Sequence, residues 1–407
     1  MLEQVDPPQS RLSGSITGTV CRKLAMAVFS RLRHGQLQIR DGDQLWQVGD
    51  EGPVAQLIIN DPLAWQKLLL GGSIGMAEAY RDGLWHSDDL TGLIGLFSRN
   101  LDLLDKLEGR FSWASKPLRK VSHLLRHNSK ANSRKNIEAH YDLSNEFYQL
   151  FLDDTMLYSS ALFSNSDDLE QAQYAKMERL CQQLQLGADD HLLEIGTGWG
   201  AMAIYAAKHY GCRVTTTTIS KAQHQEAQRR IAAAGLSDRI TLLMDDYRDL
   251  NGCFDKIVSI EMIEAVGERY LESYFQQLQQ LLKPGGRLAI QAITIADQRY
   301  QHYRNNVDFI QTYIFPGGFL PSVEVLSQQF RLHTSMVIRN IEDIGLDYGH
   351  TLALWRQRFE SQLDQVEQLG FDLRFIRLWR FYFCYCQAGF ETRRTSAIQL
   401  TADKALY

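Results

Sequence analysis

Three features that would assign this chain to a particular class are missing from its sequence. No apolar run approaches the roughly 20 residues that a helix needs to cross a bilayer. Residues 1–14 are polar and contain Pro7-Pro8, which is not the pattern of a secretory signal peptide. Positive charge is not in excess, because the formal net charge is -5 over 407 residues, and this argues against general nucleic-acid binding. The remaining composition, 44% hydrophobic and 22% charged, predicts a globular protein of two or three domains.

The cysteines lack a pattern as well. None of the six has the spacing of a metal-ligand set, so the sequence predicts no metal site and reduced, buried thiols in a cytoplasmic protein. Cys384 and Cys386 lie in an aromatic segment with helical periodicity, where side chains two residues apart point in different directions. The other four are Cys21, Cys181, Cys212 and Cys253.

Residues 1–110 predict a small α+β domain without a catalytic constellation. Alternating residues on either side of Asp41-Gly42-Asp43 indicate a β-hairpin, and a third alternating run follows it. Helical periodicity comes before the hairpin and again after Asp61-Pro62. The expected helices are 20–32, 62–70 and 76–81, the expected strands are 36–40, 45–48 and 54–59, and a turn is expected at Gly71, Gly72 and Gly75.

Residues 111–137 predict a basic linker between this domain and the rest of the chain. The segment has almost no acidic residue in an acidic protein, and Val121, Leu124 and Leu125 give it an apolar stripe. Two interpretations remain open, a patch that contacts anionic lipid headgroups and a solvated spacer. Its basic side chains are Lys116, Arg119, Lys120, Arg126, Lys130, Arg134 and Lys135, with His123 and His127.

From residue 138 onward strand and helix patterns alternate, so 138–407 predicts one α/β domain. Strands separated by helices at this spacing form a parallel sheet with right-handed crossovers, and such sheets bind ligands at the carboxyl ends of their strands. A sharp turn at Lys283-Pro284-Gly285-Gly286 should lead into the fifth strand. The expected strands are 191–195, 213–218, 240–244, 256–260 and 287–293, and the expected helices include 201–209, 221–234 and 270–282.

The most informative stretch follows the first of these strands. Glu194 lies near the end of a buried strand, and Gly196, Gly198 and Gly200 form a turn before a helix, which lets the backbone pass close to a nucleotide-like ligand. A carboxylate beside this turn would repel a pyrophosphate but suits a positively charged amino group. The pattern therefore favours S-adenosylmethionine (SAM) over NAD as the ligand, although glycine-rich turns also serve purely structural roles.

Polar residues follow each of the next three strands, where a ligand of a parallel sheet would lie. Hydroxyl and amide groups after the second strand suit a ribose, and an acid with an aromatic ring after the third suits an adenine edge. Two acids three residues apart after the fourth strand suit one shared pocket. A helix N-terminus would explain each acid alone, but successive strand ends together favour a site. These residues are, in the same order, Thr218, Ser220 and Gln223, then Asp246 and Tyr247, then Glu261 and Glu264.

Two segments before the first strand, 140–148 and 156–163, mix polar groups with many aromatic residues. Aromatic rings are suited to stabilise a sulfonium ion or a carbocation through cation–π attraction. Core packing explains the same rings and is slightly favoured by composition alone, so both interpretations stay open.

Together these motifs resemble the cyclopropane-fatty-acyl-phospholipid synthase family, which includes the mycolic-acid cyclopropane synthases and methyltransferases. The resemblance covers about residues 20–400, and its most specific part is 313–318, a Tyr-Ile-Phe-Pro-Gly-Gly stretch that ordinary SAM methyltransferases lack. Residues 31–35 and 75–85 also look like the small lipid-binding domain of the phospholipid-acting branch. The other matching segments are 140–145, 156–161, 194–200, 218–223, 246–250, 320–322 and 347–352.

The resemblance implies an α/β, Rossmann-like SAM-dependent methyltransferase fold with a mainly parallel, seven-stranded sheet. It implies that the alkene of an unsaturated phospholipid acyl chain attacks the SAM methyl carbon, that a base thought to be bicarbonate removes a proton, and that a cyclopropane closes. The family's bicarbonate site corresponds to Glu264, Tyr348 and Ile293, with Ser160 at the Cys position and Gln291 at the His position. The residues expected at the cofactor are Tyr158, Ser159, Glu194, Gly196, Gly198, Gly200, Thr218, Ser220, Gln223, Asp246 and Tyr247.

Three positions depart from the family's pattern. Ser160 can still donate a hydrogen bond to an anion, but Gln291 cannot carry the positive charge that a His can. Glu261 stands where the family commonly has a Gly, and its charge would oppose bicarbonate, so a pocket carboxylate is able to take the proton itself. Two products therefore stay open, a cyclopropane, which the resemblance favours, and a methyl- or methylene-branched chain.

Two other functions are weaker. A non-catalytic lipid- or SAM-binding relative conflicts with the intact glycines, Glu264 and Tyr348, and a small-molecule methyltransferase conflicts with the aromatic segments and the Pro-Gly-Gly stretch. The expected partners are unsaturated phospholipid acyl chains and an anionic membrane surface, which the enzyme would contact peripherally from the cytoplasm. A homodimer is a further expectation, and nucleic acid is not an expected partner.

Overall fold

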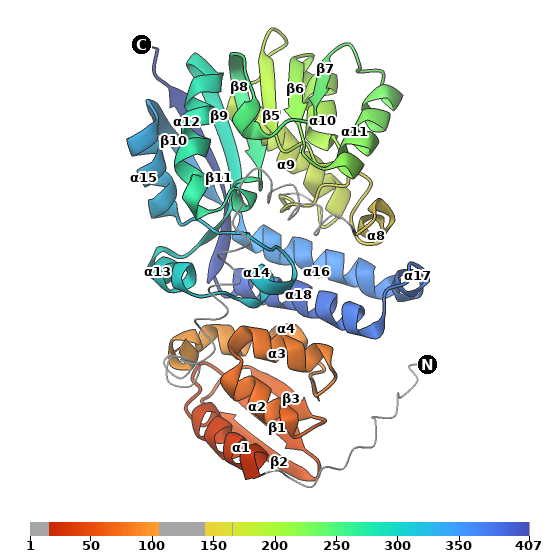
Figure 1. Ribbon diagram of the computed structural model, residues 1–407, viewed down its shortest axis with the longest axis vertical. Coiled ribbons are helices and arrows are strands. Elements are labelled where there is room, and N and C mark those ends of the chain that lie inside the picture. Colours follow the sequence, from red (N-terminus) through yellow and green to blue (C-terminus); the bar gives the residue numbers. More distant parts are fainter. Residues whose placement is uncertain (1–15, 106–142, 165, 407) are drawn as a thin grey trace. The chain divides into compact units, whose positions relative to one another are not determined.

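The computed structural model describes residues 16–105, 143–164 and 166–406 (Figure 1). The chain divides into two compact units, Met1–Ala114 and Ser115–Tyr407. The predicted linker, 111–137, lies outside the described residues, as do the first three residues of the 140–145 motif. Among the described helices, none is both long and apolar enough to cross a membrane.

The first unit contains a four-stranded sheet in the order β2-β1-β3-β4. The hairpin predicted around Asp41-Gly42-Asp43 is confirmed, because β1 pairs antiparallel with β2, while β3 runs parallel to β1. Alternation places Leu37, Ile39, Leu57 and Ile59 on the buried face of the sheet. The elements are α1 (Ile16–Phe29), β1 (Gln36–Asp41), β2 (Gln44–Gly49), β3 (Val54–Ile59), α2 (Leu63–Leu70), α3 (Gly72–Arg81), β4 (Trp85–His86) and α4 (Leu90–Arg99).

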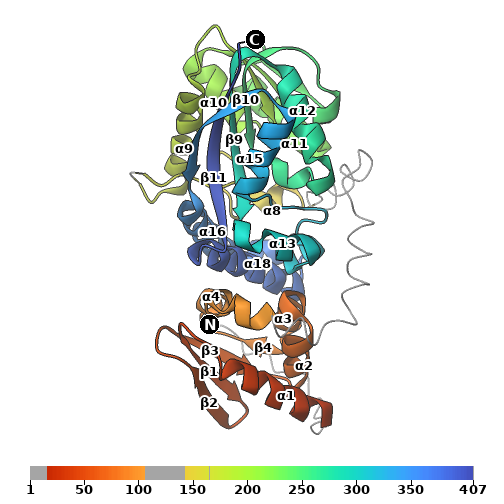
Figure 2. The same cartoon turned by 90° about the vertical axis from the view of Figure 1, so that its left-hand side faces the viewer.

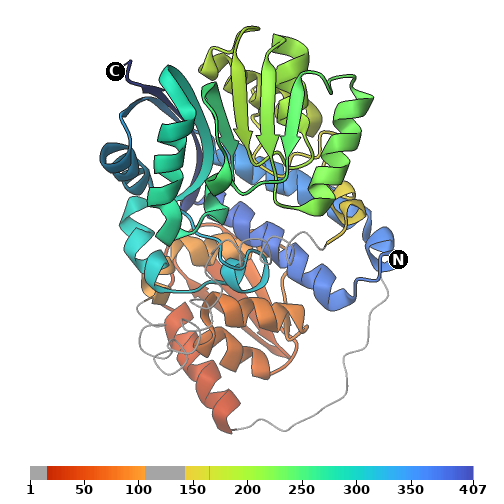
Figure 3. The same ribbon diagram turned by 45° about the horizontal axis from the view of Figure 1, so that its top comes forward.

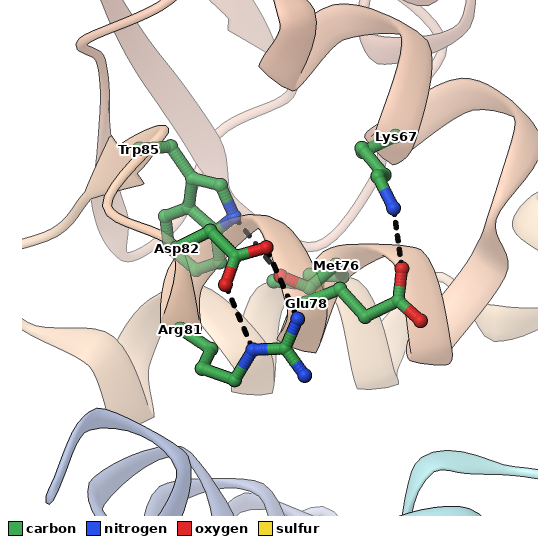
Figure 4. A network of polar contacts seen from close by, with 6 residues as sticks. All are labelled: Lys67, Met76, Glu78, Arg81, Asp82 and Trp85. Carbon is green, nitrogen blue, oxygen red and sulfur yellow. Dashed lines mark hydrogen bonds and ion pairs between the residues drawn. The ribbon is translucent and has the colours of Figure 1, made fainter. Parts of the chain in front are cut away.

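Polar contacts join α2, α3 and β4 of this unit (Figure 4). Lys67 of α2 pairs with Glu78 of α3 at 2.5 Å, and the indole of Trp85 donates a hydrogen bond of 3.0 Å to the carbonyl oxygen of Met76. Because the ion pair is partly exposed, it contributes little to stability, whereas the fully buried Trp85 ring supplies a large apolar area.

The turn predicted at Gly71, Gly72 and Gly75 is confirmed at Gly71, which separates α2 from α3, but it is wrong for Gly72, where α3 begins, and for Gly75, which lies inside α3. A Cβ atom on Gly75 would collide with the carbonyl oxygen of Lys67. The absence of a side chain there lets α2 and α3 approach closely, so Gly75 serves helix packing rather than a turn.

The second unit is built on a seven-stranded sheet in the order β10-β11-β9-β8-β5-β6-β7. The five adjacent strands β9, β8, β5, β6 and β7 are parallel to one another. Strand β11 is antiparallel to both of its neighbours, β9 and β10. The expected mainly parallel sheet and its five predicted strands are confirmed. The strands are β5 (His191–Ile195), β6 (Arg213–Thr217), β7 (Ile240–Leu243), β8 (Phe254–Ile260), β9 (Leu282–Ile295), β10 (Met336–Asp343) and β11 (Thr395–Lys404).

The turn predicted at residues 283–286 is part of β9 instead. The pairing of β8 with β9 shifts between Phe254 and Lys256, so the extra residues of β9 bulge out of the ladder. Gly285, with a φ of +73°, takes the left-handed conformation that this irregularity requires.

Both faces of the sheet are covered by helices (Figures 1 and 2). Leu192 and Val214 belong to a core with α9 and α10 on one face, and Leu193 and Ile257 belong to a core with α12 and α15 on the other. Each fully buried leucine of these cores contributes roughly 1.5–3 kcal/mol. The helices are α8 (Asn145–Gln149), α9 (Leu169–Leu184), α10 (Ala201–Tyr210), α11 (Lys221–Ala233), α12 (Leu271–Leu281), α13 (Asp297–Asn305), α14 (Phe309–Tyr313), α15 (Val323–His333), α16 (Gly345–Ser361), α17 (Leu363–Gln368) and α18 (Leu373–Glu391).

Helices α16 and α18 pack against each other and lie beyond the carboxyl ends of the parallel strands (Figure 3). They bring residues far apart in sequence to the sheet edge where ligands bind. Cys181, Cys212 and Cys384 are buried, as predicted, but Cys21 and Cys386 are only partly buried and Cys253 is exposed, so the expectation of buried thiols is wrong for these three.

Candidate active site

The glycine turn lies between β5 and α10. Gly196, Gly198 and Gly200 have φ values of +95°, +52° and +95°, which is the left-handed region that favours glycine. A Cβ atom on Gly198 would meet no atom of the described chain within 4 Å. The indole of Trp199 donates a hydrogen bond of 2.8 Å to Asn145 and so ties the turn to α8.

Glu194 precedes this turn and is almost fully buried. Its Oε2 atom accepts hydrogen bonds from the hydroxyls of Thr216, at 2.6 Å, and Thr197, at 3.1 Å. Burial raises the pKa of Glu194 to about 7, because a carboxylate loses hydration in the protein interior. A cationic group beside it would offset this loss, so the site fits the ammonium group of SAM.

The three residues expected at the ribose are brought together after β6. Ser220 is the N-cap of α11, and its hydroxyl oxygen accepts a hydrogen bond of 3.3 Å from the amide of Gln223. The hydroxyl of Thr218 donates to Oε1 of Gln223 at 3.0 Å and accepts from the amide of Ser220 at 3.2 Å. These bonds fix the start of α11, and contact with a ribose stays a prediction.

Asp246 and Tyr247, expected at the adenine, follow β7. The guanidinium of Arg248 donates to both carboxylate oxygens of Asp246, at 2.7 Å and 2.6 Å. The ring of Tyr247 lies in the core, 5.4 Å from the ring of Tyr274, with Arg248 over its face at 5.3 Å. The ion pair accounts for Asp246, whereas the hydroxyl of Tyr247 is buried without a hydrogen-bond partner among the described residues, and the adenine contact stays a prediction. Arg248 was not predicted as a site residue, although it follows Asp246 by two residues in the sequence.

The aromatic segments divide into two groups. Tyr158 is only partly buried, and its hydroxyl lies 2.9 Å from that of Tyr382. Its ring centroid is 5.2 Å from Trp355 and 6.3 Å from Phe315. For this group the cation–π role stays a prediction, whereas core packing accounts for the fully buried rings of Phe147, Tyr148 and Phe151.

Glu261 begins the loop after β8 in a strained conformation. Its φ of +49° lies in the left-handed region, which costs a residue with a side chain roughly 1–2 kcal/mol. Its amide donates a hydrogen bond of 2.8 Å to the carbonyl oxygen of Gln291, which continues the ladder between β8 and β9. A glycine suits this conformation, in agreement with the Gly that the resemblance places here, so side-chain contacts must offset the strain in this chain.

The carboxylate of Glu261, a half-buried residue, is the centre of a hydrogen-bonded cluster. Its Oε1 atom accepts from the backbone amide of Ser160 at 2.8 Å and from Nε2 of Gln291 at 2.9 Å. Its Oε2 atom accepts from the hydroxyl of Tyr348 at 2.8 Å. All three donors are buried. The structure therefore brings four of the predicted catalytic residues to one point.

Ser160 takes part differently from the expectation. Its hydroxyl donates to the carbonyl oxygen of Ala161 at 2.9 Å, and only its backbone amide faces Glu261. In this arrangement the main chain, not the side chain, of Ser160 meets the carboxylate, and donation from its hydroxyl to an anion stays a prediction.

Glu264, a half-buried residue, supplies the second carboxyl group of the cluster. Its Oε1 atom accepts a hydrogen bond of 2.5 Å from the amide of Ile293, and its Oε2 atom is buried without a partner among the described residues. Burial, and then the charge of Glu261, raise the pKa of Glu264 to about 8. Burial also raises the pKa of Glu261, but the hydrogen bond from Gln291 and the charge of Lys176 oppose that rise. At neutral pH Glu264 therefore holds a proton, and Glu261 is the better stabilised anion.

Lys176 of α9 belongs to this cluster and was not predicted. It is 0% exposed, and its Nζ atom donates a hydrogen bond of 2.7 Å to the hydroxyl of Ser159. Burial lowers the pKa of Lys176 to about 8, although the charges of Glu261 and Asp153 oppose the lowering. The sequence signal for Lys176 was its place on an apolar face: its spacing from the neighbouring apolar residues fits the helical period.

The comparisons with known proteins agree with this geometry. A model of the mycolic acid cyclopropane synthetase family matches residues 128–400. The tuberculostearic acid methyltransferase UfaA1 of Mycobacterium tuberculosis is 36% identical over 406 residues, which cover 97% of this chain and 92% of that protein. The cyclopropane-fatty-acyl-phospholipid synthase of Escherichia coli is 35% identical over 355 residues, which cover 86% of this chain and 88% of that protein.

Solved structures are similar as well. The mycolic acid cyclopropane synthase CmaA1 in complex with SAH and CTAB is 29% identical, with a TM-score of 0.63 over 67% of this chain and 98% of that one. The predicted Rossmann-like methyltransferase fold and the resemblance drawn from the motifs are therefore confirmed. The chain belongs to the mycolic acid cyclopropane synthetase family.

Proposed function

We propose that this chain, a SAM-dependent methyltransferase, transfers a methyl carbon to the double bond of an unsaturated phospholipid acyl chain. We further propose that Glu261 accepts the proton that the alkylated chain must lose. The favoured product is a methyl- or methylene-branched chain, as the name of the relative UfaA1, a tuberculostearic acid methyltransferase, suggests.

One observation carries the proposal. Ser160, Gln291 and Tyr348 are residues that the resemblance assigns to a bicarbonate site, and all three donate hydrogen bonds to the Glu261 carboxylate. A bicarbonate ion does not fit beside a carboxylate that already uses these donors, because two anions would compete for them. The side chain of Glu261 therefore supplies the carboxylate that the family otherwise recruits from solution.

The hydrogen bonds also favour one atom as the proton acceptor. Each carboxylate oxygen has about two lone-pair directions. Oε1 of Glu261 uses both, toward Ser160 and Gln291, whereas Oε2 uses one, toward Tyr348. The free direction at Oε2 is the place for the incoming proton. Because burial raises the pKa of Glu261, this carboxylate is a stronger base than an exposed one.

The chemistry then follows from what each group can do. When bound, SAM supplies an electrophilic methyl carbon, which forms a bond to the alkene as its bond to sulfur breaks. The positive charge remains on the neighbouring chain carbon. The carboxylate of Glu261 stabilises this charge at short range and then accepts a proton from the alkylated chain. Glu264, neutral at pH 7, adds no competing negative charge.

Which proton leaves decides the product. Loss from the new methyl group with bond formation to the cation closes a cyclopropane. Loss from a neighbouring chain carbon leaves a methyl-branched alkene, and a hydride shift before loss from the methyl group leaves a methylene branch. A base fixed to the backbone at Glu261 has less freedom to reach the methyl group than a diffusible ion, which favours the methyl-branched alkene. The methylene branch, like the cyclopropane, needs a proton from the methyl group. The cyclopropane stays the second candidate, favoured by the similarity to the Escherichia coli synthase.

For the cofactor, we propose that Glu194 binds the amino group and that Gly196, Gly198 and Gly200 pass beneath the methionine part of SAM. Thr218, Ser220 and Gln223 would serve the ribose, and Asp246 and Tyr247 the adenine. Tyr158 and Ser159 would close the site from the other side, where Lys176 holds the Ser159 hydroxyl.

The test uses cells that express the protein and are fed methionine with a fully deuterated methyl group. Mass spectrometry of the acyl chains is expected to show three deuterium atoms in a methyl-branched alkene and two in a methylene or a cyclopropane product, which chromatography separates. E261Q keeps the shape but not the base, so activity should fall by about 10²–10⁴-fold while SAM still binds.

Glu272→Gln, on an exposed position of α12, is the matched control and should act as the unmodified protein does. If E261Q retained full activity, or if the unmodified protein made only cyclopropane and required added bicarbonate, the proposal would be wrong.

A further inference from the structure

A second buried glutamine lies behind the catalytic cluster. Gln399 of β11 is 0% exposed and is directly opposite Gln291 in the antiparallel pair of β11 and β9. Its Nε2 atom donates a hydrogen bond of 3.0 Å to Oε1 of Gln291. Its own Oε1 atom is buried without a partner among the described residues. A buried amide with only one end bonded is costly, so the bond to Gln291 calls for an explanation beyond packing.

The side chain of Gln291 is asymmetric, and its surroundings demand one orientation. An amide presents donors at nitrogen and an acceptor at oxygen. Nε2 of Gln291 faces two acceptors, Oε1 of Glu261 at 2.9 Å and the carbonyl oxygen of Ser160 at 3.2 Å. A rotation of the amide by 180° would place its oxygen against both of these oxygens. The donor of Gln399 on the opposite side favours the observed orientation and disfavours the rotated one.

We propose that Gln399 is a positioning residue, which holds the amide of Gln291 so that Oε1 of Glu261 stays saturated and Oε2 alone accepts the proton. The inference rests on the proposed function, because it assigns Gln399 a part in the choice of the proton that leaves. Without Gln399, the amide of Gln291 loses one of the three hydrogen bonds that favour the observed orientation, so it rotates more often, and Oε1 of Glu261 then becomes available as a base as well.

Charged groups around Gln399 bear on the test. The residue opposite it on β10 is Glu342, which pairs with Arg179 of α9. Lys176 lies one turn before Arg179 on the same helix, and Glu261 lies beyond Gln291. A new carboxyl group at 399 would have its pKa raised by burial and the two glutamates, and lowered by the two cations.

Gln399→Glu is the decisive variant because it keeps the size of the side chain. Its neutral carboxyl group can donate to Oε1 of Gln291, but its ionised form cannot. The activity of Q399E relative to the unmodified protein should therefore fall by about tenfold or more between pH 6 and pH 9, because the unmodified protein has no ionisable group at this position. A ratio that does not change with pH would overturn the proposal.

Gln399→Met removes the donor at every pH with little change in volume. We expect a lower kcat with an unchanged KM for the lipid, and a second proton-loss product of at least a few per cent of the total. Thr401→Val is the control, since Thr401 is buried on the same face of β11, two residues farther along. An unaltered product ratio in Q399M would contradict the inference, and Q399E at low pH still tests it if Q399M does not fold.

A double-mutant cycle separates the two proposals. If Gln399 acts through Gln291, then Q399M should change neither rate nor product ratio further in a Q291M background. An equal effect of Q399M in both backgrounds would show that Gln399 acts elsewhere and would overturn the inference alone. Full activity of E261Q would instead overturn the proposed function, so the two failures are distinguishable.

Discussion

Glu261 and Glu264 present two carboxyl groups to the same cluster, and only Glu261 has hydrogen bonds to both of its oxygens. Glu261 accepts from three donors, whereas Glu264 accepts from the amide of Ile293 and has a buried oxygen without a partner in the described part of the chain. The environments separate the roles of the two groups, one as the anion and base, the other as a neutral acid. This separation is the basis of the predictions on product and pH.

The first prediction concerns the product. The triple variant Ser160→Cys, Gln291→His and Glu261→Gly restores the residues of the family's pattern, so the cluster should again accept bicarbonate. We expect its products to shift toward the cyclopropane and its activity to depend on added bicarbonate. Gas chromatography of the acyl esters measures both. A triple variant that makes the same branched products without bicarbonate would show that these three positions do not select the product.

The second prediction concerns Lys176. Its positive charge lowers the pKa of Glu261, so Lys176→Met should raise that pKa. Because Glu261 must be ionised to act as a base, the rising limb of the rate against pH should move to higher pH. Initial rates between pH 5.5 and pH 9 measure the shift, with the exposed Lys208→Met as a control. An unshifted limb in a folded K176M protein would rule out the influence of Lys176 on the base.

The third prediction concerns Glu194, whose pKa is raised to about 7 by burial. The affinity for SAM should rise with pH through that value, because the carboxylate form binds the ammonium group. Between the ordinary pKa of 4.5 and about 7 the folded state binds more protons than the unfolded one, so the stability of the ligand-free protein should fall as pH rises. Glu194→Gln should remove this slope and weaken SAM binding. Calorimetry and thermal unfolding at pH 5 and pH 8 test both effects, and an unchanged slope in E194Q would contradict the assignment.

The fourth prediction concerns the glycine turn. Gly198→Val should abolish SAM binding for two reasons: its φ of +52° is strained for a branched residue, and the side chain would fill the open face of the turn. Gly235→Val, also in a left-handed conformation with open space, is the control for backbone strain alone. Calorimetry that finds equal SAM affinity in G198V and the unmodified protein would exclude this placement of the cofactor.

The fifth prediction concerns the membrane. The basic segment 111–137 is expected to contact anionic headgroups, so binding to vesicles should rise with their anionic lipid content and weaken with salt. Replacement of Lys116, Arg119, Lys120 and Arg126 by Gln should reduce binding in a sedimentation assay. If the quadruple variant binds as well as the unmodified protein, the segment is only a spacer.

Local sequence patterns were sufficient to predict many of the strands and helices of the second unit. The strand β5, the glycine turn and the helix α10 follow from a buried apolar run, glycines at left-handed positions and helical periodicity, all of which act within a few residues. The antiparallel strands β10 and β11 were not identified by residue pattern, because their pairing joins segments about 60 residues apart. The polar residues of β11 even weaken its strand pattern.

The sequence by itself determined the family, the parallel core of the sheet and the set of residues at its strand ends, because these depend on local periodicity and on motifs. Only the tertiary structure decided what those residues do to one another. Ser160 and Tyr348 are 101 and 87 residues from Glu261, yet both donate to its carboxylate, and Gln399 reaches the cluster only through the pairing of β11 with β9. Hydrogen bonds depend on distances of a few tenths of an ångström and on the direction of each donor, and packing between distant segments sets both.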